Sequence, residues 1–313
     1  MRILITGGAG FIGTALANRL LLEGHQVRVI DDLSGGTLEP LHPDIHFTRG
    51  NVTDKPKLWG LLNRIDCVYH LAARVSVPES ILYPREYNAT NVGGTVALME
   101  AMRDAGVKRV VFASSGAIYG DQHAGHVTED RSPKPTSPYG VSKLSAEYYV
   151  SSIGQLWGIE TVILRIFNAY GPGQPLPPAH PPVIPQFMQQ ALWEGSLMIH
   201  GSGQQIRDFV YIDDVINGLV AAASAGGIDG QIINIGSGAG TAINELVTLI
   251  SSVTNRKLQI LHVNSESGGV SNLVADISLA QKLLDYYPQV SLQDGLTLLQ
   301  VHDDRFQQVK RRA

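Results

Sequence analysis

Short apolar runs alternate with longer segments of helical periodicity through the first half of the chain. The runs are rich in Val and Ile and end in turn residues, as expected of strands buried on both faces of a parallel sheet. They cover residues 3–5, 27–30, 45–47, 67–70, 110–112 and 161–164. Helix-length segments lie between them at 12–23, 86–105 and 138–157. Because right-handed βαβ units build a doubly wound parallel sheet, the pattern predicts an α/β fold of that kind.

The pattern changes after Gly171. Residues 172–182 hold six prolines, which exclude a helix or a central strand. We interpret this stretch as an ordered loop that leads into a second, smaller α/β lobe; a flexible linker is the alternative. The remaining periodicity predicts strands at 196–200 and 231–235 and helices at 183–194, 211–225, 241–254, 277–285 and 291–309.

Charge and cysteine content narrow the class of protein. The chain has 24 Lys and Arg against 28 Asp and Glu, so it offers no basic surface for nucleic acid or an anionic membrane. Cys67 is the single cysteine, which excludes an internal disulfide and a multi-cysteine metal site. The histidines have no metal-ligand spacing either, so no metal is expected. Glycines interrupt the apolar N-terminus, which predicts neither a signal peptide nor a membrane span and favours a cytoplasmic protein.

A glycine-rich segment, TGGAGFIG at residues 6–13, follows the first predicted strand and opens the first predicted helix. Gly7, Gly10 and Gly13 allow a tight turn and let a pyrophosphate approach the free N–H groups at a helix N-terminus. Asp31 ends the second predicted strand, where a carboxylate accepts the ribose hydroxyls and repels a 2′-phosphate. Asp32 is the competing candidate for that role. The sequence therefore predicts a Rossmann-type site for NAD rather than NADP.

Tyr139 and Lys143 are four residues apart on a predicted helix that Ser137 caps and Pro138 begins. Both side chains then lie on one helical face. An ammonium about 5 Å from a phenol, at an effective dielectric of about 20, favours the phenolate by roughly 3 kcal/mol, or about 2 pKa units. The positive charge of an oxidised nicotinamide would add to this effect, so we expect a tyrosine that acts as a general base near neutral pH, although the same spacing also occurs in plain surface pairs.

Ser114 and Ser115 close the predicted strand that begins near Val110. Ligands of doubly wound sheets bind at the carboxyl ends of the strands, so a serine hydroxyl there can bridge a substrate hydroxyl and Tyr139. A turn serine without a function is the alternative. Neither serine lies in a G-x-S-x-G turn, which argues against an acyl nucleophile.

These motifs together resemble the extended short-chain dehydrogenase/reductases, in particular the NAD-dependent nucleotide-sugar epimerase/dehydratase group and its 4-epimerases of UDP-glucose and UDP-N-acetylglucosamine. The resemblance covers nearly the whole chain. Its motifs are TGGAGFIG (6–13), DDLS (31–34), HLAA (70–73), NVGGT (91–95), SSGAIYG (114–120), SPYGVSK (137–143), LRIFNAYGP (164–172), VIPQF (183–187) and RDFVYIDD (207–214).

The resemblance implies a role for each matching residue. Tyr139 is then the base, Lys143 its electrostatic partner and Ser115 the catalytic serine. The implied cofactor-binding residues are Gly7, Gly10, Phe11, Ile12, Gly13, Asp31, Asp32, Asn51, Val52, Leu71, Ala72, Ala73, Asn91, Ser114, Tyr139 and Lys143. The implied substrate-binding residues are Ser115, Tyr139, Asn168, Val183, Phe187, Arg207 and Leu273.

The resemblance also implies two units and a homodimer. Residues 1–170, with roughly 208–236 returning to them, would bind the dinucleotide, and 171–207 with 237–313 would bind the nucleotide-sugar substrate. In this family, the helices at 86–105 and 138–157 form a four-helix dimer interface. From sequence alone, the chain itself could equally cover their apolar faces.

Gly116 and Ala117 separate this chain from the dehydratases and decarboxylases of the group, which place acidic residues there. We therefore expect oxidation and re-reduction at one carbon, as in a 4-epimerase of the UDP-glucose/UDP-galactose type with a transient 4-keto sugar. An NAD(P)H-dependent reductase of a nucleotide-linked keto sugar and a non-catalytic dinucleotide-binding sensor are the alternatives.

Two departures from the family pattern bear on the substrate. Glu266 and Gly269 stand where relatives carry Arg and Asp, and a bulky Leu273 stands at the place that gates the hexose.

Overall fold

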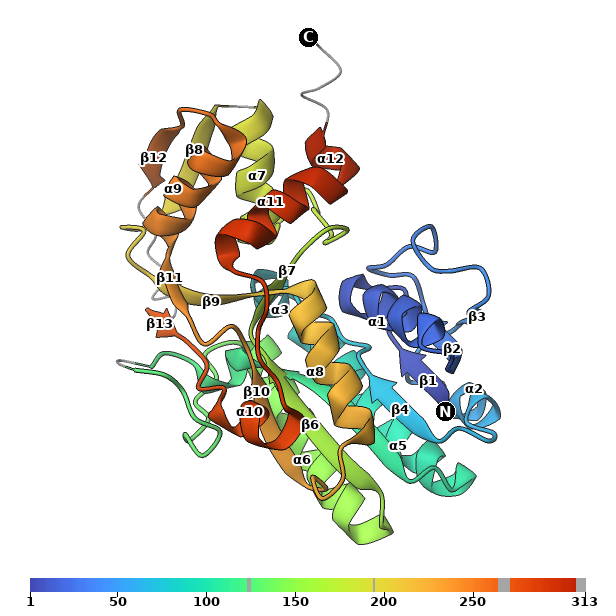
Figure 1. The fold of residues 1–313 in the computed structure, drawn as a ribbon. Helices are drawn as coiled ribbons and strands as arrows, with labels where there is room; N and C mark the ends of the chain where they lie inside the picture. Colours follow the sequence, from blue (N-terminus) through green and yellow to red (C-terminus); the bar gives the residue numbers. More distant parts are fainter. Residues whose placement is uncertain (123–124, 194, 264–270, 308–313) are drawn as a thin grey trace.

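A computed structural model describes residues 1–122, 125–193, 195–263 and 271–307. A seven-stranded sheet forms its centre, with every neighbouring pair parallel and the strand order β10-β6-β5-β4-β1-β2-β3 (Figure 1). Its strands are β1 (Arg2–Thr6), β2 (Gln26–Asp31), β3 (His46–Arg49), β4 (Cys67–His70), β5 (Arg109–Ser115), β6 (Glu160–Ile166) and β10 (Gln231–Ile235). Each apolar run predicted in the first half lies in this sheet, which confirms the doubly wound fold.

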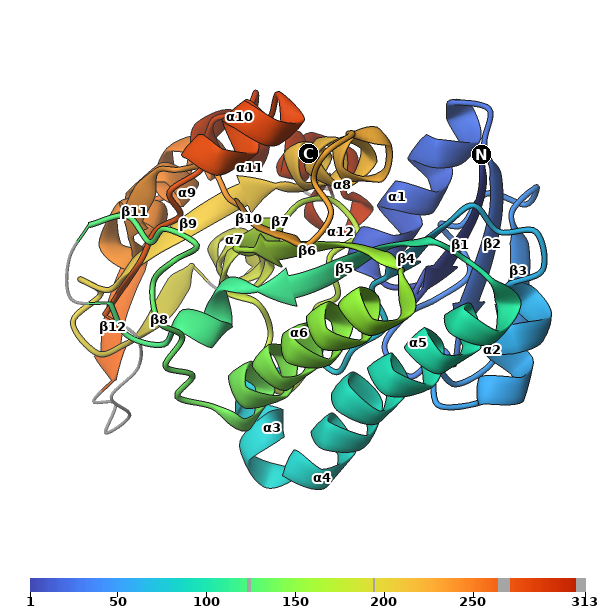
Figure 2. The ribbon, with the colours of Figure 1, turned by 90° about the horizontal axis from the view of Figure 1, so that it is seen from below.

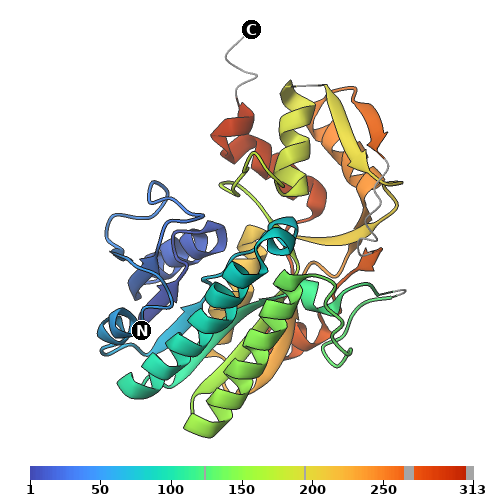
Figure 3. The ribbon, with the colours of Figure 1, turned by 180° about the vertical axis from the view of Figure 1, so that it is seen from behind.

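Helices cover both faces of this sheet (Figure 2). On one face, α1 (Phe11–Leu22) packs against α8 (Ile212–Ser224). On the other face, α2 (Lys55–Leu61), α5 (Gly94–Ala105) and α6 (Pro138–Trp157) lie side by side in that order (Figures 2 and 3). The strands are buried on both sides because both helical layers place their apolar residues against them.

One predicted helix contains a π-helical turn, and another is divided. The segment 86–105 contains the end of α4 (Pro84–Tyr87), a π-helical turn at Asn88–Gly93 and then α5. The segment 291–309 ends α11 (Leu292–His302) at Asp303 and resumes as α12 (Asp304–Gln307). Periodicity does not reveal the π-helical turn or the break at Asp303. Residues 308 and 309 lie outside the described residues.

A smaller α/β part follows the Pro-rich segment. A four-stranded sheet has the order β11-β9-β13, with β7 also paired to β9, and β8 pairs with β12. Its strands are β7 (Asn168–Tyr170), β8 (Ser196–His200), β9 (Ile206–Tyr211), β11 (Gly240–Ala242), β12 (Gln259–Val263) and β13 (Asn272–Leu273). The remaining helices are α3 (Val77–Leu82), α7 (Val183–Trp193), α9 (Ile243–Thr254) and α10 (Ser278–Leu284).

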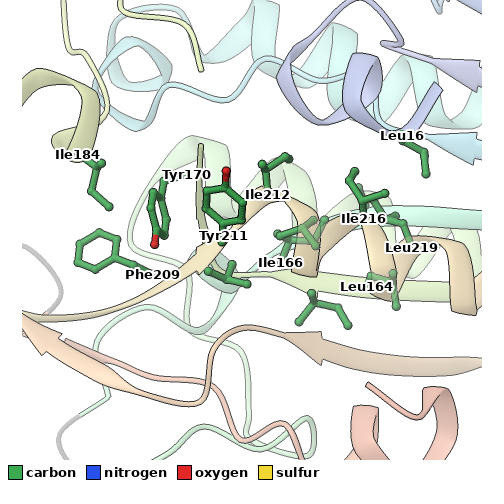
Figure 4. Packing of buried hydrophobic residues seen from close by; sticks show 14 of the residues in the cluster. Leu16, Leu164, Ile166, Tyr170, Ile184, Phe209, Tyr211, Ile212, Ile216 and Leu219 are labelled. Atoms are coloured by element: carbon green, nitrogen blue, oxygen red, sulfur yellow. The ribbon is translucent and has the colours of Figure 1, made fainter. Parts of the chain in front are cut away.

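The apolar core runs without interruption from the large sheet into the smaller part (Figure 4). At the junction, the rings of Tyr170 and Tyr211 meet edge to face with centroids 5.6 Å apart. Phe209 and Ile184 lie beside them in the smaller part, and Ile212 lies toward the large sheet. Since these side chains belong to one packed cluster, the core fixes β7 and β9 relative to the strands that carry the candidate site.

The start of the Pro-rich segment is attached to the C-terminal helices. The Gly173 N–H donates to Asp303 Oδ2 at 3.0 Å, and Arg305 Nη2 donates to the Gln174 carbonyl at 2.8 Å. Arg305 also pairs with Asp303 at 2.6 Å. These contacts explain the helix break at Asp303, whose carboxylate is buried among them. Within the described residues, no helix is long and apolar enough to cross a membrane.

Candidate active site

The glycine-rich turn lies between β1 and α1. Gly7 has a φ of +72°, and a Cβ there would lie 2.6 Å from the Ala72 backbone nitrogen. A Cβ at Gly13 would lie 2.1 Å from the Gly7 carbonyl oxygen, so only glycine fits either place. Gly10 caps α1 in an extended conformation without a side-chain cap, which leaves N–H groups of Phe11 and Ile12 at the helix start open to a phosphate.

Asp31 connects this turn to the end of β2. Its carboxylate accepts hydrogen bonds from the Ala9 N–H at 3.0 Å and the Leu33 N–H at 2.8 Å. Burial raises the pKa of Asp31, and the two backbone hydrogen bonds oppose that rise. Each carboxylate oxygen still has a lone pair for a ribose hydroxyl. These contacts place Asp31 beside the turn, as a dinucleotide site requires.

Asp32 has different partners. It accepts from the Ser34 N–H at 2.9 Å and from Asn51 Nδ2 at 3.0 Å. Asn51 stands where the resembled family usually has Asp, and its amide supplies a donor where a second carboxylate would repel Asp32. Next to it, Val52 is buried against Gly94, so its side chain serves the core.

The loop after β4 is fixed by a buried hydrogen-bonded network that the sequence analysis missed. The Ala72 N–H donates to Thr6 Oγ1 at 3.3 Å, and Thr6 Oγ1 lies 2.7 Å from His70 Nδ1. On the other side, His70 Nε2 lies 2.9 Å from Thr95 Oγ1, which donates to the Asn91 carbonyl at 2.6 Å. Burial lowers the pKa of His70 to about 3, so the ring is neutral. The network holds half-buried Leu71, Ala72 and Ala73 beside the glycine-rich turn.

Asn91, in the π-helical turn, links the same loop to α6. Its Oδ1 accepts from the Arg74 N–H at 2.8 Å, and its Nδ2 donates to the Arg74 carbonyl at 3.0 Å and to Ser142 Oγ at 2.9 Å. Ser142 Oγ in turn donates to the Tyr139 carbonyl at 2.8 Å. Both amide N–H groups of Asn91 are therefore used within the protein, and its expected contact with the cofactor stays a prediction.

The expected catalytic side chains lie together at the carboxyl end of β5. Ser115 ends this strand, and its Oγ accepts from the Ala117 N–H at 3.2 Å at the start of a 3₁₀ turn, Gly116–Tyr119. Tyr139 and Lys143 lie on the first turns of α6, whose start Ser137 caps as predicted. The Tyr139 phenol makes a hydrogen bond with Ser115.

Two polar atoms here have unusual surroundings. Ser114 Oγ is buried and has no hydrogen-bond partner among the described residues. Lys143 Nζ lies 4.4 Å from the centroid of the Phe112 ring and is 3% exposed as a residue. Unsatisfied buried polar groups are rare in proteins, so Ser114 Oγ, next to buried Lys143, indicates a place prepared for a polar ligand. Together with the glycine-rich turn and Asp31, it fits a bound dinucleotide.

Burial opposes the charged form of both Tyr139 and Lys143 in the protein without its cofactor. Burial raises the pKa of Tyr139, and the hydrogen bond with Ser115 opposes this only in part. Burial also lowers the pKa of Lys143 to about 8, with the Glu147 carboxylate opposing. An effective dielectric of about 20 describes a partly solvated pair. In the structure, burial is the largest cause of both pKa shifts, and it disfavours the charged form of each side chain.

The expected substrate residues lie on the smaller part and beside it. Asn168 is half-buried on β7, and Arg207 is half-buried on β9, in register with Leu273 of β13. Leu273 is 6% exposed and packs with Ile118 and Phe167. Arg207 Nη1 donates to the Ile206 carbonyl at 2.8 Å, and burial lowers its pKa while Asp121 opposes this.

Asp121 is a neighbour of Arg207 that the sequence analysis did not single out. It also accepts from the Ser271 N–H and hydroxyl, each at 2.7 Å. Val183 begins α7 and is half-buried, whereas Phe187 is 3% exposed within the core. Glu266 and Gly269 lie outside the described residues.

A glycine-rich turn, an acidic strand end and a buried Tyr–Lys pair on one helix define a dinucleotide-dependent α/β enzyme. The chain belongs to the NAD dependent epimerase/dehydratase family, whose model matches residues 3–236. NAD is therefore its cofactor. An uncharacterized UDP-glucose epimerase of Bacillus subtilis, YtcB, is 39% identical and covers 95% of this chain and 96% of its own length.

Solved structures agree in fold and differ in substrate. The UDP-glucose 4-epimerase of Thermotoga maritima with UDP-glucose is 36% identical with a TM-score of 0.91, covering 96% of this chain and 97% of its own. The UDP-glucuronic acid 4-epimerase of Bacillus cereus with UDP-glucuronic acid and NAD is 35% identical with a TM-score of 0.89, covering 99% and 100%. A relative found by sequence, the UDP-N-acetyl-alpha-D-glucosaminuronate decarboxylase of Bacillus cytotoxicus, is 32% identical. The match covers 94% of this chain and 95% of that protein.

Proposed function

We propose that the protein is a 4-epimerase of a nucleoside-diphosphate hexose, of the UDP-glucose/UDP-galactose type. The observation that carries the proposal is the grouping of Ser115, Tyr139 and Lys143 at one strand end with Gly116 and Ala117 next to them. This site offers one proton acceptor and no second acid or base at the position where dehydratases and decarboxylases carry one. Epimerisation at one carbon needs only that single proton relay.

Tyr139 and Ser115 have different roles in the proposed epimerisation. Tyr139 accepts the proton of the sugar C4 hydroxyl, and Ser115 orients both oxygens through its hydroxyl. Bound NAD supplies the acceptor, and later the donor, of the C4 hydride. After the 4-keto sugar has turned over in the site, Tyr139 returns the proton to the new C4 hydroxyl.

Binding of the two ligands is assigned to different residues. The glycine-rich turn and Asp31 would hold the pyrophosphate and a ribose of NAD. Arg207 would hold the diphosphate of the sugar nucleotide, since a guanidinium matches phosphate geometry. Asn168, Val183 and Phe187 would contact the rest of the nucleotide sugar. In this proposal, residues 1–170 with 208–236 bind the cofactor, and 171–207 with 237–313 bind the substrate.

We propose a UDP-hexose as the substrate because similar proteins carry the name UDP-glucose epimerase or UDP-glucose 4-epimerase. Others are named for UDP-glucuronic acid, so the substituent at C5 is the main variable. In this proposal, Leu273, which is in register with Arg207, would give the hexose end an apolar wall. An apolar wall favours a neutral hydroxymethyl group over a carboxylate, because it cannot compensate a buried charge.

A homodimer forms part of the proposal. α6 carries an exposed apolar stripe of Val141, Tyr148, Tyr149 and Leu156, between 46% and 75% exposed. These residues recur at helical spacing along α6, which packs beside α5 (Figure 3). Pairing this stripe with a second copy would remove it from water.

The cytoplasmic location expected from the sequence stays a prediction.

Proton NMR of the purified protein with UDP-glucose, UDP-N-acetylglucosamine and UDP-glucuronic acid, without added cofactor, tests the function. We expect a C4 epimer of UDP-glucose to appear and to approach equilibrium. The uronate and the N-acetyl sugar should react more slowly. If all three remain unchanged while NAD is bound to the protein, the proposal fails. Loss of carbon dioxide from the uronate would instead favour a decarboxylase.

A further inference from the structure

Three ionisable side chains share one face of α6 at intervals of four residues. Tyr139, Lys143 and Glu147 are all buried, with Glu147 only 1% exposed. The first two belong to the proposed chemistry, but no role has been given to the third. A fully buried carboxylate is costly unless it is paired, so its presence one helical turn from Lys143 requires an explanation.

Arg165 on β6 holds Glu147 in place. Arg165 Nε donates to Glu147 Oε1 at 3.1 Å, and Nη2 donates to Oε2 at 2.9 Å, which is a bidentate pair. The remaining donor, Nη1, is used by the Tyr119 hydroxyl at 2.8 Å and the Glu129 carbonyl at 3.0 Å. The guanidinium also lies 4.9 Å from the centre of the Tyr119 ring. Both carboxylate oxygens of Glu147 are therefore fixed, one helical turn from Lys143.

The other groups around Lys143 carry no negative charge. On β4, His70 is neutral, and on β5 the Phe112 ring faces the ammonium. From α4, Tyr87 packs edge-on against Tyr139 with ring centroids 6.4 Å apart, and burial raises its pKa, so it stays protonated. Among the described residues, Glu147 is the anion that favours the charged form of Lys143.

The net charge of Tyr139, Lys143, Glu147 and Arg165 depends on the protonation of Tyr139. Lys143 and Arg165 are positive and Glu147 is negative, so the group has a net charge of +1 while Tyr139 is a phenol. It becomes neutral when Tyr139 is a phenolate. A buried cluster is more stable when its charges cancel, so this arrangement favours the phenolate only as long as Lys143 is an ammonium.

We propose that Glu147, fixed by Arg165, is a positioning residue that keeps Lys143 in its ammonium form beside Tyr139. Its effect on turnover rests on the proposed function, whereas its effect on the charge of Lys143 does not. The experiment therefore measures the two separately.

The first measurement follows the protonation of Lys143 by NMR of protein labelled at the lysine ε-carbons. The chain has eight lysines, and the signal missing from Lys143→Met assigns the residue. In Glu147→Gln, we expect the midpoint of the Lys143 titration to fall by about one to two pH units. The matched control is Glu160→Gln, which breaks the Arg109–Glu160 pair of 2.9 Å elsewhere on β6 and should leave the midpoint unchanged. An unchanged midpoint in folded Glu147→Gln overturns the proposal.

If Glu147→Gln does not fold, the same Lys143 titration is measured in the double variant Glu147→Met/Arg165→Met. Replacing both members of a buried ion pair by apolar side chains of similar size is often neutral for stability. The variant removes the anion Glu147 and the cation Arg165 together, and Glu147 is the charge that acts on the pKa of Lys143, so the titration should again move to lower pH. A folded double variant with the wild-type midpoint contradicts the proposal.

The second measurement is the pH profile of kcat. We expect the basic limb to move to lower pH in Glu147→Gln, with wild-type rates approached at low pH and KM unchanged. A merely structural role would lower kcat equally at every pH. If the wild-type protein turns over no sugar nucleotide, the proposed function fails, and the Lys143 titration still decides the present proposal.

Discussion

The hydrogen bond between His70 Nε2 and Thr95 Oγ1 has a fixed direction. Thr95 uses its only proton for the Asn91 carbonyl, so it accepts from His70 and Nε2 carries the imidazole proton. His70 Nδ1 then accepts the hydroxyl proton of Thr6. The neutral ring therefore satisfies both nitrogens and connects β1, the end of β4 and α5 beneath the glycine-rich turn.

This relationship predicts a dependence of stability on pH. The folded pKa of His70 is lowered to about 3, while the unfolded chain titrates near 6.5. The unfolded state binds more protons between these values, so this contribution is complete above pH 6.5 and is lost progressively as pH falls toward 3. Urea unfolding of His70→Leu should show a flatter pH dependence than the wild type over this window, at least down to the pH where the protein still folds.

The same variant should be less stable at pH 7 by about 2–4 kcal/mol, because Thr6 and Thr95 lose a buried partner. His46→Leu, on the exposed edge strand β3, is the control and should change the free energy of unfolding by less than about 0.5 kcal/mol. Equal stabilities for the two variants would show that the His70 network contributes nothing.

Asp31 and Asp32 can be distinguished by their partners. Asp31→Asn should lower the amount of NAD that remains bound after purification about tenfold or more, since the ribose and the Ala9 N–H lose a carboxylate. Asp32→Asn should retain most of the NAD, because Asp32 contacts Ser34 and Asn51 instead. Cofactor content by absorbance after denaturation measures both, and the reverse order would assign the ribose to Asp32.

Tyr139→Phe removes the proposed base without changing the ring. We expect kcat to fall by about 10³-fold or more, with an unchanged melting temperature and unchanged NAD content. Tyr87→Phe, whose ring packs against Tyr139, is the matched control and should retain a rate within about tenfold of the wild type. A Tyr139→Phe enzyme that still turns over at the wild-type rate would place the base elsewhere.

Arg207→Gln tests the diphosphate contact. The expected result is a rise in KM for the sugar nucleotide, and in the inhibition constant of the free nucleoside diphosphate, of about 10- to 100-fold, with a smaller change in kcat. Arg256→Gln, an exposed arginine after α9, should alter neither constant. If Arg207→Gln binds the nucleoside diphosphate as tightly as the wild type, Asp121 neutralises Arg207 and another group binds the phosphates.

The sequence predicts the large sheet well because its strands are local apolar runs and its turn depends on glycine geometry. β9 and β13 were not predicted. Their pairing joins residues 206–207 to 272–273, and no local pattern encodes that distance. Similarly, the pairing of Glu147 with Arg165 joins a helix to a strand through the interior.

The charge state of the site was predicted less well than its position. The spacing of Tyr139 and Lys143 indicates their common face, but periodicity does not say how completely that face is buried. Because burial decides the sign of both pKa shifts, the structure was needed to show that the protein alone does not lower the pKa of Tyr139.

The most direct test of the central claim uses UDP-glucose carrying deuterium at C4, in ordinary water and without added cofactor. We predict that the C4 epimer forms with its deuterium retained at C4, since the hydride leaves and returns within one site. Loss of the label to water, or conversion that requires added NADH, would contradict a 4-epimerase with transient oxidation at C4.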